Sequence, residues 1–137
     1  MSAPARRLVL IVEDSRDCAE TLQIAFEALA GVEVAICSSA RNLWPILERD
    51  GARIGAIVTD LHLSETNGLE IIRAIRADRR VSRIPIVMIS GDSDPRISQV
   101  ALSSGASAYF AKPYSPSAVR KKLEELLCDN DLAERPW

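Results

Sequence analysis

The sequence is poor in features that would tie the protein to an oxidising compartment, a membrane or a nucleic acid. Its three cysteines among 137 residues are too widely spaced for a disulfide framework or a zinc cluster, so we interpret them as reduced thiols. The first apolar run, Leu8 to Val12, is shorter than a signal-peptide core or a membrane span. The net charge of −2 lacks the basic excess of nucleic-acid-binding proteins. We therefore expect a cytoplasmic protein that binds neither membranes nor nucleic acids.

The chain is rich, by contrast, in short apolar runs that alternate with amphipathic stretches. Its length suits one domain, and the run from Leu8 to Val12 is continuously apolar, as in a strand that is buried on both faces. Alternation of such strands with helices predicts an α/β fold, with a parallel sheet and right-handed helical crossovers on both of its faces. The strands are predicted at residues 8–12, 32–37, 56–59, 84–89 and 108–111.

The helices are predicted from apolar residues at helical spacing and from residues that favour helix ends. Ser15 can cap the first helix and Gly31 can end it. In the fourth helix, Asp94 is the expected N-cap, Pro95 the first helical residue and Gly105 the stop. The third and fifth helices follow from their apolar positions, which are Leu69, Ile72 and Ile75, and then Val119, Leu123, Leu126 and Leu127.

The second helix and the end of the chain are less regular. Pro45 lies too deep for the first turn if Ser39 is the N-cap, so this helix either starts near Leu43 or kinks at the proline. Residues 129–137 are mostly polar, and we expect them to form a short loose tail. The predicted organisation is thus one domain over residues 1–128 followed by a tail, without an output domain.

Four of the five predicted strands end in polar or charged residues. In an open α/β sheet, ligands bind beyond the carboxyl ends of the strands, near the point where the strand order reverses. Each residue at that edge has an ordinary interpretation, as a helix cap, a loop residue or a solvated charge. Their joint placement at successive strand ends favours a single site, formed by Glu13, Asp14, Asp60, Ser90 and Lys112.

These residue types indicate phosphoryl transfer assisted by a metal ion. Three carboxylates would repel one another unless a cation lay among them, and hard oxygen ligands suit Mg²⁺. Lys112 adds a positive charge, and Ser90 adds a hydroxyl donor that could reach an incoming oxygen. Positioning and charge neutralisation dominate the catalysis of phosphoryl transfer. A carboxylate such as Asp60 can be the nucleophile and form an acyl phosphate.

Several short motifs occur in an order and spacing that is specific to one family. They are Val-Glu-Asp at 12–14, Val-Thr-Asp at 58–60, Asn-Gly-Leu-Glu at 67–70, Ile-Ser-Gly at 89–91, Gly-Ala at 105–106 and Tyr-Phe-Ala-Lys-Pro at 109–113. With them the chain resembles, from Leu8 to Leu127, the receiver domain of two-component response regulators of the single-domain chemotaxis type. The resemblance implies a flavodoxin-like, doubly wound (βα)5 fold, whose five-stranded parallel sheet has the order 2-1-3-4-5.

The resemblance also implies a role for each residue that would handle the phosphoryl group. Asp60 would be the phosphoacceptor, Ser90 would hydrogen-bond the phosphoryl group, and Lys112 would be its counter-charge. Tyr109 would be the aromatic switch residue that moves between outward and inward positions, or else a half-buried ring whose hydroxyl lies in water. The family's Lys-Pro turn implies a cis peptide bond between Lys112 and Pro113, against a base rate of about 5% for such bonds.

By the same resemblance the cofactor is one Mg²⁺ ion. Asp14 and Asp60 would be direct ligands, Glu13 a ligand through water, and His62 would supply its backbone carbonyl. Two features depart from the family pattern or vary within it. Ser64 replaces the usual proline in the loop after the phosphoacceptor. His62 and Asp92 occupy a variable pair that tunes the lifetime of the phosphoryl group, or they are surface residues without a role.

The resemblance implies a signalling switch rather than an enzyme, since the protein would catalyse only its own phosphorylation and dephosphorylation. A histidine kinase or phosphotransfer protein would donate the phosphoryl group, and a downstream target would recognise the changed surface. We expect a monomer.

The strongest rival function is that of a binding module that works without phosphorylation. A flavodoxin-like cofactor binder is disfavoured by the acidic Glu13-Asp14 loop, which would repel a phosphate. A phosphatase with an aspartyl nucleophile resembles this chain less, because His62 stands where its second aspartate would be.

Overall fold

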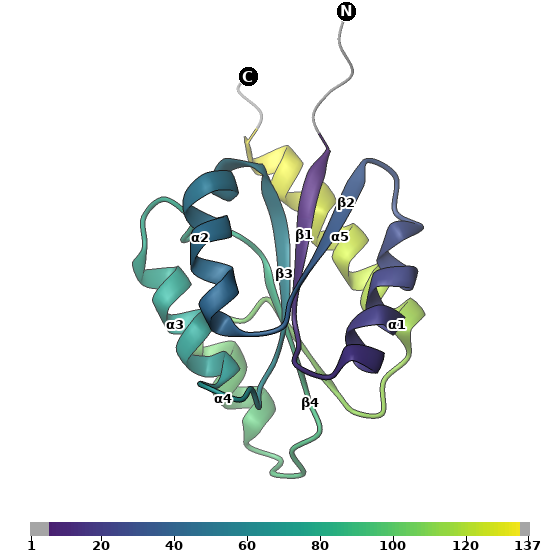
Figure 1. Cartoon of the computed structure of the whole chain (residues 1–137), viewed down its shortest axis with the longest axis vertical. Helices are drawn as coiled ribbons and strands as arrows, with labels where there is room; N and C mark the ends of the chain where they lie inside the picture. Colours follow the sequence, from purple (N-terminus) through teal and green to yellow (C-terminus); the bar gives the residue numbers. More distant parts are fainter. Residues whose placement is uncertain (1–5, 135–137) are drawn as a thin grey trace, which may run out of the picture.

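The computed structural model of the chain describes residues 6–134, and from residue 129 onward it describes the backbone alone. A central sheet lies between two layers of helices (Figure 1). All paired strands are parallel and their order is β2-β1-β3-β4-β5, so the predicted doubly wound topology is confirmed. The strands are β1 (Arg7–Val12), β2 (Val32–Cys37), β3 (Ile54–Asp60), β4 (Ile86–Ser90) and β5 (Ala108–Ala111).

The helices divide between the two faces of the sheet according to their apolar sides. The helices α1 and α5 share one buried cluster with residues of β1, β3 and β4, while α2 and α3 pack into a second cluster on the other face, where α4 adds Ala101. All of β3 is buried, which explains its continuous apolar sequence. The helices are α1 (Arg16–Glu27), α2 (Ala40–Asp50), α3 (Gly68–Ala77), α4 (Ile97–Ser104), α5 (Pro116–Glu134) and the short 3-10 helix η1 (Gly51–Arg53).

The first two helices differ in part from the prediction. Ser15 caps α1 as expected, accepting a hydrogen bond from the Cys18 backbone, but the helix ends at Glu27 rather than at Gly31. Gly31 lies instead in the turn before β2, with a φ of 71° that favours glycine. Pro45 lies inside α2, which begins directly after Ser39, so the late start is wrong. The buried side chains of this helix on both sides of the proline keep it against the core.

The fourth helix and the end of the chain also differ from the prediction. The N-cap of α4 is Arg96, not Asp94, because the Asp94 carboxylate binds the backbone and the side chain of Arg96 and closes a separate turn. Gly105 ends α4 with a φ of 120°, as predicted. The helix α5 continues to Glu134, so residues 129–134 are not a loose tail. No glycine or proline interrupts that stretch before Pro136, and residues 135–137 lie outside the described part.

The two ends of the sheet are built from different parts of the chain. The carboxyl ends of the strands lead into the loops that carry the polar residues of the predicted site. At the amino end, β1 and the later turns of α5 meet around Gly55, where an added Cβ would lie 2.6 Å from Leu127 Cδ2 and 3.3 Å from Arg7 Cβ. Among residues 6–134, no helix combines the length and the hydrophobicity needed to cross a membrane.

Candidate functional site

Asp60 is the last residue of β3, and both oxygens of its carboxylate accept hydrogen bonds at the carboxyl edge of the sheet. It is only 6% exposed. The Lys112 ammonium donates to Asp60 Oδ2 at 2.7 Å, and the backbone N–H of His62 donates to Oδ1 at 3.2 Å. Parallel pairing explains how distant residues meet here, because β4 lies beside β3 and the Lys112 backbone N–H donates to Ser90 O. The two donors hold the carboxylate in one orientation.

Glu13 is a second buried carboxylate beside this pair. It is 4% exposed, its Oε1 accepts a hydrogen bond from the Ser15 backbone, and its Oε2 lies 3.6 Å from Lys112 Nζ. Burial, together with the neighbouring Asp60, raises the pKa of Glu13 from 4.5 to about 7. Burial lowers the pKa of Lys112, but its hydrogen bond to Asp60 and the charges of both carboxylates prevail and raise it. The single ammonium group of Lys112 thus forms ion pairs with two buried carboxyl groups.

Asp14 does not join this cluster. Its side chain is exposed, and the Ser64 hydroxyl donates to Asp14 Oδ2 at 3.0 Å. Within the described part of the chain, no three acidic, histidine or cysteine side chains are grouped so that they could hold a metal ion. The structure therefore brings Glu13, Asp60 and Lys112 together and leaves Asp14 bonded to the loop that follows Asp60.

The donor set nevertheless has the chemistry that a hard cation requires. Glu13 and Asp60 are buried carboxylates that carry more negative charge than Lys112 can neutralise. The pKa of Glu13 is raised mainly by burial and further by the neighbouring Asp60. Asp14 adds a third carboxylate on the adjacent residue, and oxygen ligands of this kind suit Mg²⁺. A divalent ion fits these residues chemically, although Asp14 would have to leave Ser64 to reach it.

Ser90 and Tyr109 lie farther from Asp60 in their contacts. Ser90 is completely buried, and its Oγ accepts a hydrogen bond from the Asp92 backbone at 2.9 Å. Among the described residues no acceptor takes the proton of this hydroxyl, so it remains available to a new acceptor. Tyr109 is half-buried on β5 and packs against the cluster on the α2–α3–α4 face. No hydrogen bond joins Asp60 to either residue in the described part.

The structure also shows an interaction between His62 and Asp92, beside the site, that was not predicted from the sequence. His62 Nε2 lies 3.2 Å from Asp92 Oδ2, and the two side chains are 69% and 28% exposed. The residues are far apart in sequence, but each follows the end of its strand by two positions, at Asp60 and at Ser90. Because β3 and β4 are parallel neighbours, with Asp60 paired to Ile89, the residues that follow their carboxyl ends lie near one another, and this signal was available in the sequence.

The peptide bond between Lys112 and Pro113 is cis, as predicted. At the start of α3, Gly68 lies against the Asp60 backbone, where an added Cβ would overlap the Asp60 carbonyl oxygen and approach Met88 Cε to 2.8 Å. The loop between Asp60 and Gly68 is further closed by a β-bridge between His62 and Asn67. The backbone around Asp60 is therefore closely packed.

Comparison with known proteins gives one consistent family. The response regulator receiver domain family matches residues 9–124. The chemotaxis protein CheY1 of Helicobacter pylori (strain J99) is 30% identical over 123 residues, which cover 90% of this chain and 98% of that protein. The structure of the Vibrio cholerae chemotaxis protein CheY4 has a TM-score of 0.77 at 25% identity, covering 89% of this chain and 99% of that one.

A further solved structure extends the likeness in fold. The CheY-like response regulator receiver domain protein of Methanospirillum hungatei has a TM-score of 0.82 at 23% identity, and the match covers 94% of this chain and 99% of that one. The family match spans most of the sequence, and the strand order agrees with it. This chain belongs to the response regulator receiver domain family.

Proposed function

We propose that the chain is a phosphorylation-dependent signalling switch, in which Asp60 accepts a phosphoryl group from a phosphohistidine donor in the cytoplasm. The donor would be a histidine kinase or a phosphotransfer protein, and a downstream protein would read the altered surface. The observation that carries the proposal is the buried Asp60 carboxylate, held 2.7 Å from Lys112 with Glu13 beside them at the carboxyl edge. Membership of the receiver family supports phosphorylation-based signalling.

The proposed step is an in-line displacement at phosphorus. A carboxylate oxygen of Asp60 forms the new O–P bond while the N–P bond to the donor imidazole breaks, and the imidazole leaves with the electron pair and takes up a proton. The His62 backbone N–H and Lys112 orient the attacking carboxylate. Lys112 then stands beside the transferred group, where its charge offsets the new negative charge.

Mg²⁺ would be held by Asp14, Asp60 and the His62 backbone carbonyl, with Glu13 acting through water. When bound, it supplies positive charge to the oxygens of the transferring group. The residues themselves must also rearrange, since Ser64 holds Asp14 and Lys112 bridges the two buried carboxylates. The Ser64 hydroxyl is therefore a group that competes for Asp14.

Ser90 and Tyr109 would couple the modification to the surface. The unused proton of the Ser90 hydroxyl can be donated to a phosphoryl oxygen, which would draw the loop after β4 toward Asp60. Tyr109 could then rotate inward and change the surface of α4, β5 and α5. Charge-assisted bonds of about 1.5–3 kcal/mol each are of the size that such a population shift requires.

The first experiment treats the chain with acetyl phosphate and Mg²⁺ and measures its intact mass. We expect the mass increase of one phosphoryl group in the wild type and none in Asp60→Asn, because only a carboxylate can form the acyl phosphate. Asp92→Asn is the matched control, since it changes an acid near the site that is not the acceptor, and it should still be labelled. Absence of labelling in the folded wild type, together with no response to beryllofluoride, would favour the module that acts without phosphorylation.

The second experiment measures Mg²⁺ binding without any phosphoryl donor. Mg²⁺ should raise the unfolding midpoint of the wild type, since a ligand at ten times its Kd stabilises by about 1.4 kcal/mol. Asp14→Asn should lose this shift, and Ser64→Ala should keep it at lower Mg²⁺ concentration, because Asp14 is then released. An unchanged shift in Asp14→Asn would refute the metal assignment.

A further inference from the structure

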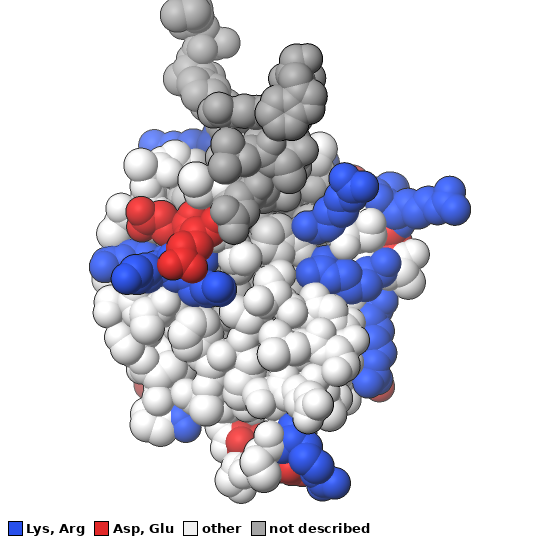
Figure 2. All heavy atoms as spheres, turned by 180° about the vertical axis from the view of Figure 1, so that it is seen from behind, with Lys and Arg blue, Asp and Glu red and all other residues white. Residues whose placement is uncertain are grey.

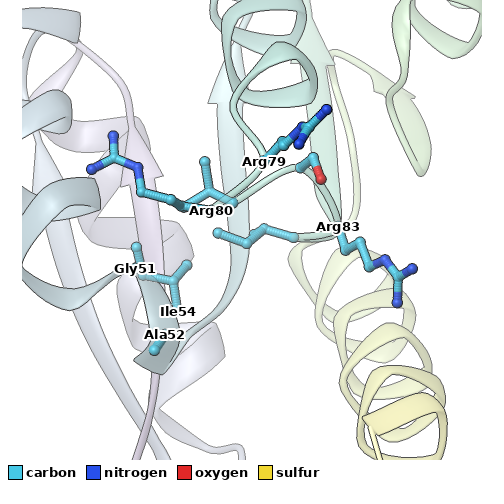
Figure 3. Close-up of a pocket in the computed structure, with 9 residues that line it drawn as sticks. Gly51, Ala52, Ile54, Arg79, Arg80 and Arg83 are labelled. Carbon is cyan, nitrogen blue, oxygen red and sulfur yellow. The ribbon is translucent and has the colours of Figure 1, made fainter.

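A hollow of about 210 Å³ lies at the amino end of the sheet, the end opposite Asp60. It is formed by η1 and the start of β3 on one side and by the loop that joins α3 to β4 on the other (Figure 3). We call residues 78–85 the α3–β4 loop. Because β3 runs from Ile54 to Asp60, about 20 Å of strand separates the hollow from the phosphoacceptor, at about 3.3 Å per residue.

The α3–β4 loop exposes three arginines, and two of them have no partner among the residues that the structure describes. Arg80 forms a two-pronged ion pair with Asp78, whose oxygens lie 2.8 and 3.1 Å from the guanidinium nitrogens. In the part of the chain that the structure describes, the side chains of Arg79 and Arg83 form neither an ion pair nor a hydrogen bond. Figure 2 shows Lys and Arg gathered on the side where α3 and its loop lie, next to an uncharged middle.

The loop is fixed in place before any partner binds. The Arg76 guanidinium donates to the carbonyl oxygens of Ser82 at 2.9 Å and Ile84 at 2.6 Å, and also to that of Gly105 at 3.0 Å. Two residues of the loop itself, Val81 and Ile84, are buried in the core. A binding surface that is already ordered loses less conformational entropy when a partner docks. The arginines therefore project from a rigid base.

The directions of the side chains indicate the size of the partner. Figure 3 shows Arg79, Arg80 and Arg83 spreading away from the loop instead of converging on the hollow, so they cannot chelate one small anion. Duplex DNA and anionic membranes are also poor fits. Proteins that bind duplex DNA through its backbone make roughly 6–10 phosphate contacts, and membrane recognition uses clusters of about 4–8 basic residues. Within the described part of the chain this loop offers two unpaired guanidinium groups, Arg79 and Arg83, on a chain of net charge −2.

We propose that the α3–β4 loop docks an acidic peptide segment of a partner protein through Arg79 and Arg83. Carboxylates are the anions that an arginine fork binds with two parallel hydrogen bonds, and successive acidic side chains of an extended peptide can reach guanidinium groups that point apart. A side chain of the peptide can enter the hollow beside η1. Since the surface lies at the end away from Asp60, docking is compatible with both phosphorylation states and tethers the partner in each.

The test measures binding of a fluorescein-labelled decaglutamate peptide to the full chain by fluorescence anisotropy, at low and high salt. We expect saturable binding that salt weakens, with equal affinity in the presence and absence of beryllofluoride and Mg²⁺. Arg79→Glu with Arg83→Glu should weaken binding at least about tenfold. The control, Arg120→Glu with Lys121→Glu on α5, makes the same change in net charge and should weaken it less than about twofold.

A second double variant distinguishes the loss of a binding contact from a loss of folding. Arg79→Lys with Arg83→Lys preserves the charge but not the forked geometry, and it should bind the peptide with an affinity between the wild type and the Glu variant. The proposal is overturned if the wild type shows no saturation, or if both charge-reversal pairs lose affinity equally. Tighter binding to duplex DNA or to phosphatidylglycerol vesicles than to the peptide would also overturn it, as would binding confined to the beryllofluoride form.

Discussion

The two ends of the sheet carry their charges in opposite ways. At the carboxyl end, Glu13 and Asp60 are buried and both lie close to Lys112, so each of the three charged groups interacts directly with the others. At the amino end, Arg79 and Arg83 are exposed and unpaired in the described part of the chain. The same strands thus separate a tightly coupled site from a freely accessible one. A charge that is tied to its neighbours suits a switch, and a charge without a partner suits docking.

The energetics of the two ends should differ for the same reason. Removing one partner of a buried, hydrogen-bonded ion pair leaves an uncompensated charge and costs about 3–5 kcal/mol when burial is complete. An exposed ion pair contributes about 0–1 kcal/mol, since water solvates the charges once they separate. Substitutions made in matched pairs, one at each end, therefore measure this contrast.

The largest expected difference lies between two glycines. In Gly68→Ala the new methyl group would overlap the Asp60 carbonyl oxygen, and we expect a loss of about 3 kcal/mol because backbone cannot move aside cheaply. In Gly51→Ala the methyl would lie 3.1 Å from Val81 Cγ1, a side chain that can shift, so the change should stay within about 1 kcal/mol. Urea denaturation followed by circular dichroism measures both. Equal losses would mean that the two ends are packed alike.

A smaller difference is expected between two cations. Lys112→Met should lower the free energy of unfolding by about 2 kcal/mol, less than for a fully buried pair because the Lys112 side chain is partly exposed. Arg80→Met should lower it far less, since its pair with Asp78 lies at the surface and water solvates both charges once they separate. The same denaturation experiment compares the two variants. A larger loss for Arg80→Met would contradict the contrast.

The smallest effect concerns two thiols. Burial raises the pKa of Cys37, at the carboxyl end of β2, from 9.0 to about 11. The unfolded chain therefore loses this proton first, and stability falls as pH rises from about 9 to about 11, by roughly 1 kcal/mol near pH 9.5. Below that window Cys37 should resist iodoacetamide while the exposed Cys128 reacts, as peptide mass mapping would show. Cys37→Ala should remove this part of the pH dependence, and an unchanged profile would rule out Cys37 as its source.

The sequence predicted the parts of the fold that depend on regular apolar patterns. The five strands and their order followed from continuous apolar runs and the family motifs. Helix ends were harder to place, because Asp94 binds Arg96 in a local turn instead of capping α4. Pro45 was judged by its effect on the backbone alone, whereas the tertiary packing of α2 determines where that helix begins.

For the candidate site, the sequence predicted that Glu13, Asp60 and Lys112 lie together at the edge, but it also placed Asp14 with them, and Asp14 bonds to Ser64 instead. The grouping of Asp60 with Lys112 and Glu13 follows from the strand ends. The Ser64–Asp14 hydrogen bond depends on the path of one loop, for which the sequence carries no periodic signal. No sequence motif marks Arg79 and Arg83 of the α3–β4 loop, and the structure is needed to show, through the bonds of Arg76, that they stand on a fixed base.

The meeting of β1 and α5 around Gly55 has a consequence for protein engineering. Because Arg7 and Leu127 both approach this glycine, the first strand and the last helix approach each other at the amino end of the sheet. A first strand and a last helix that lie close together are the geometry that circular permutation requires. A permutant that joins this strand and helix through a short linker could be opened in a distant surface loop, and a reporter domain inserted at the junction would leave the Asp60 edge uncovered.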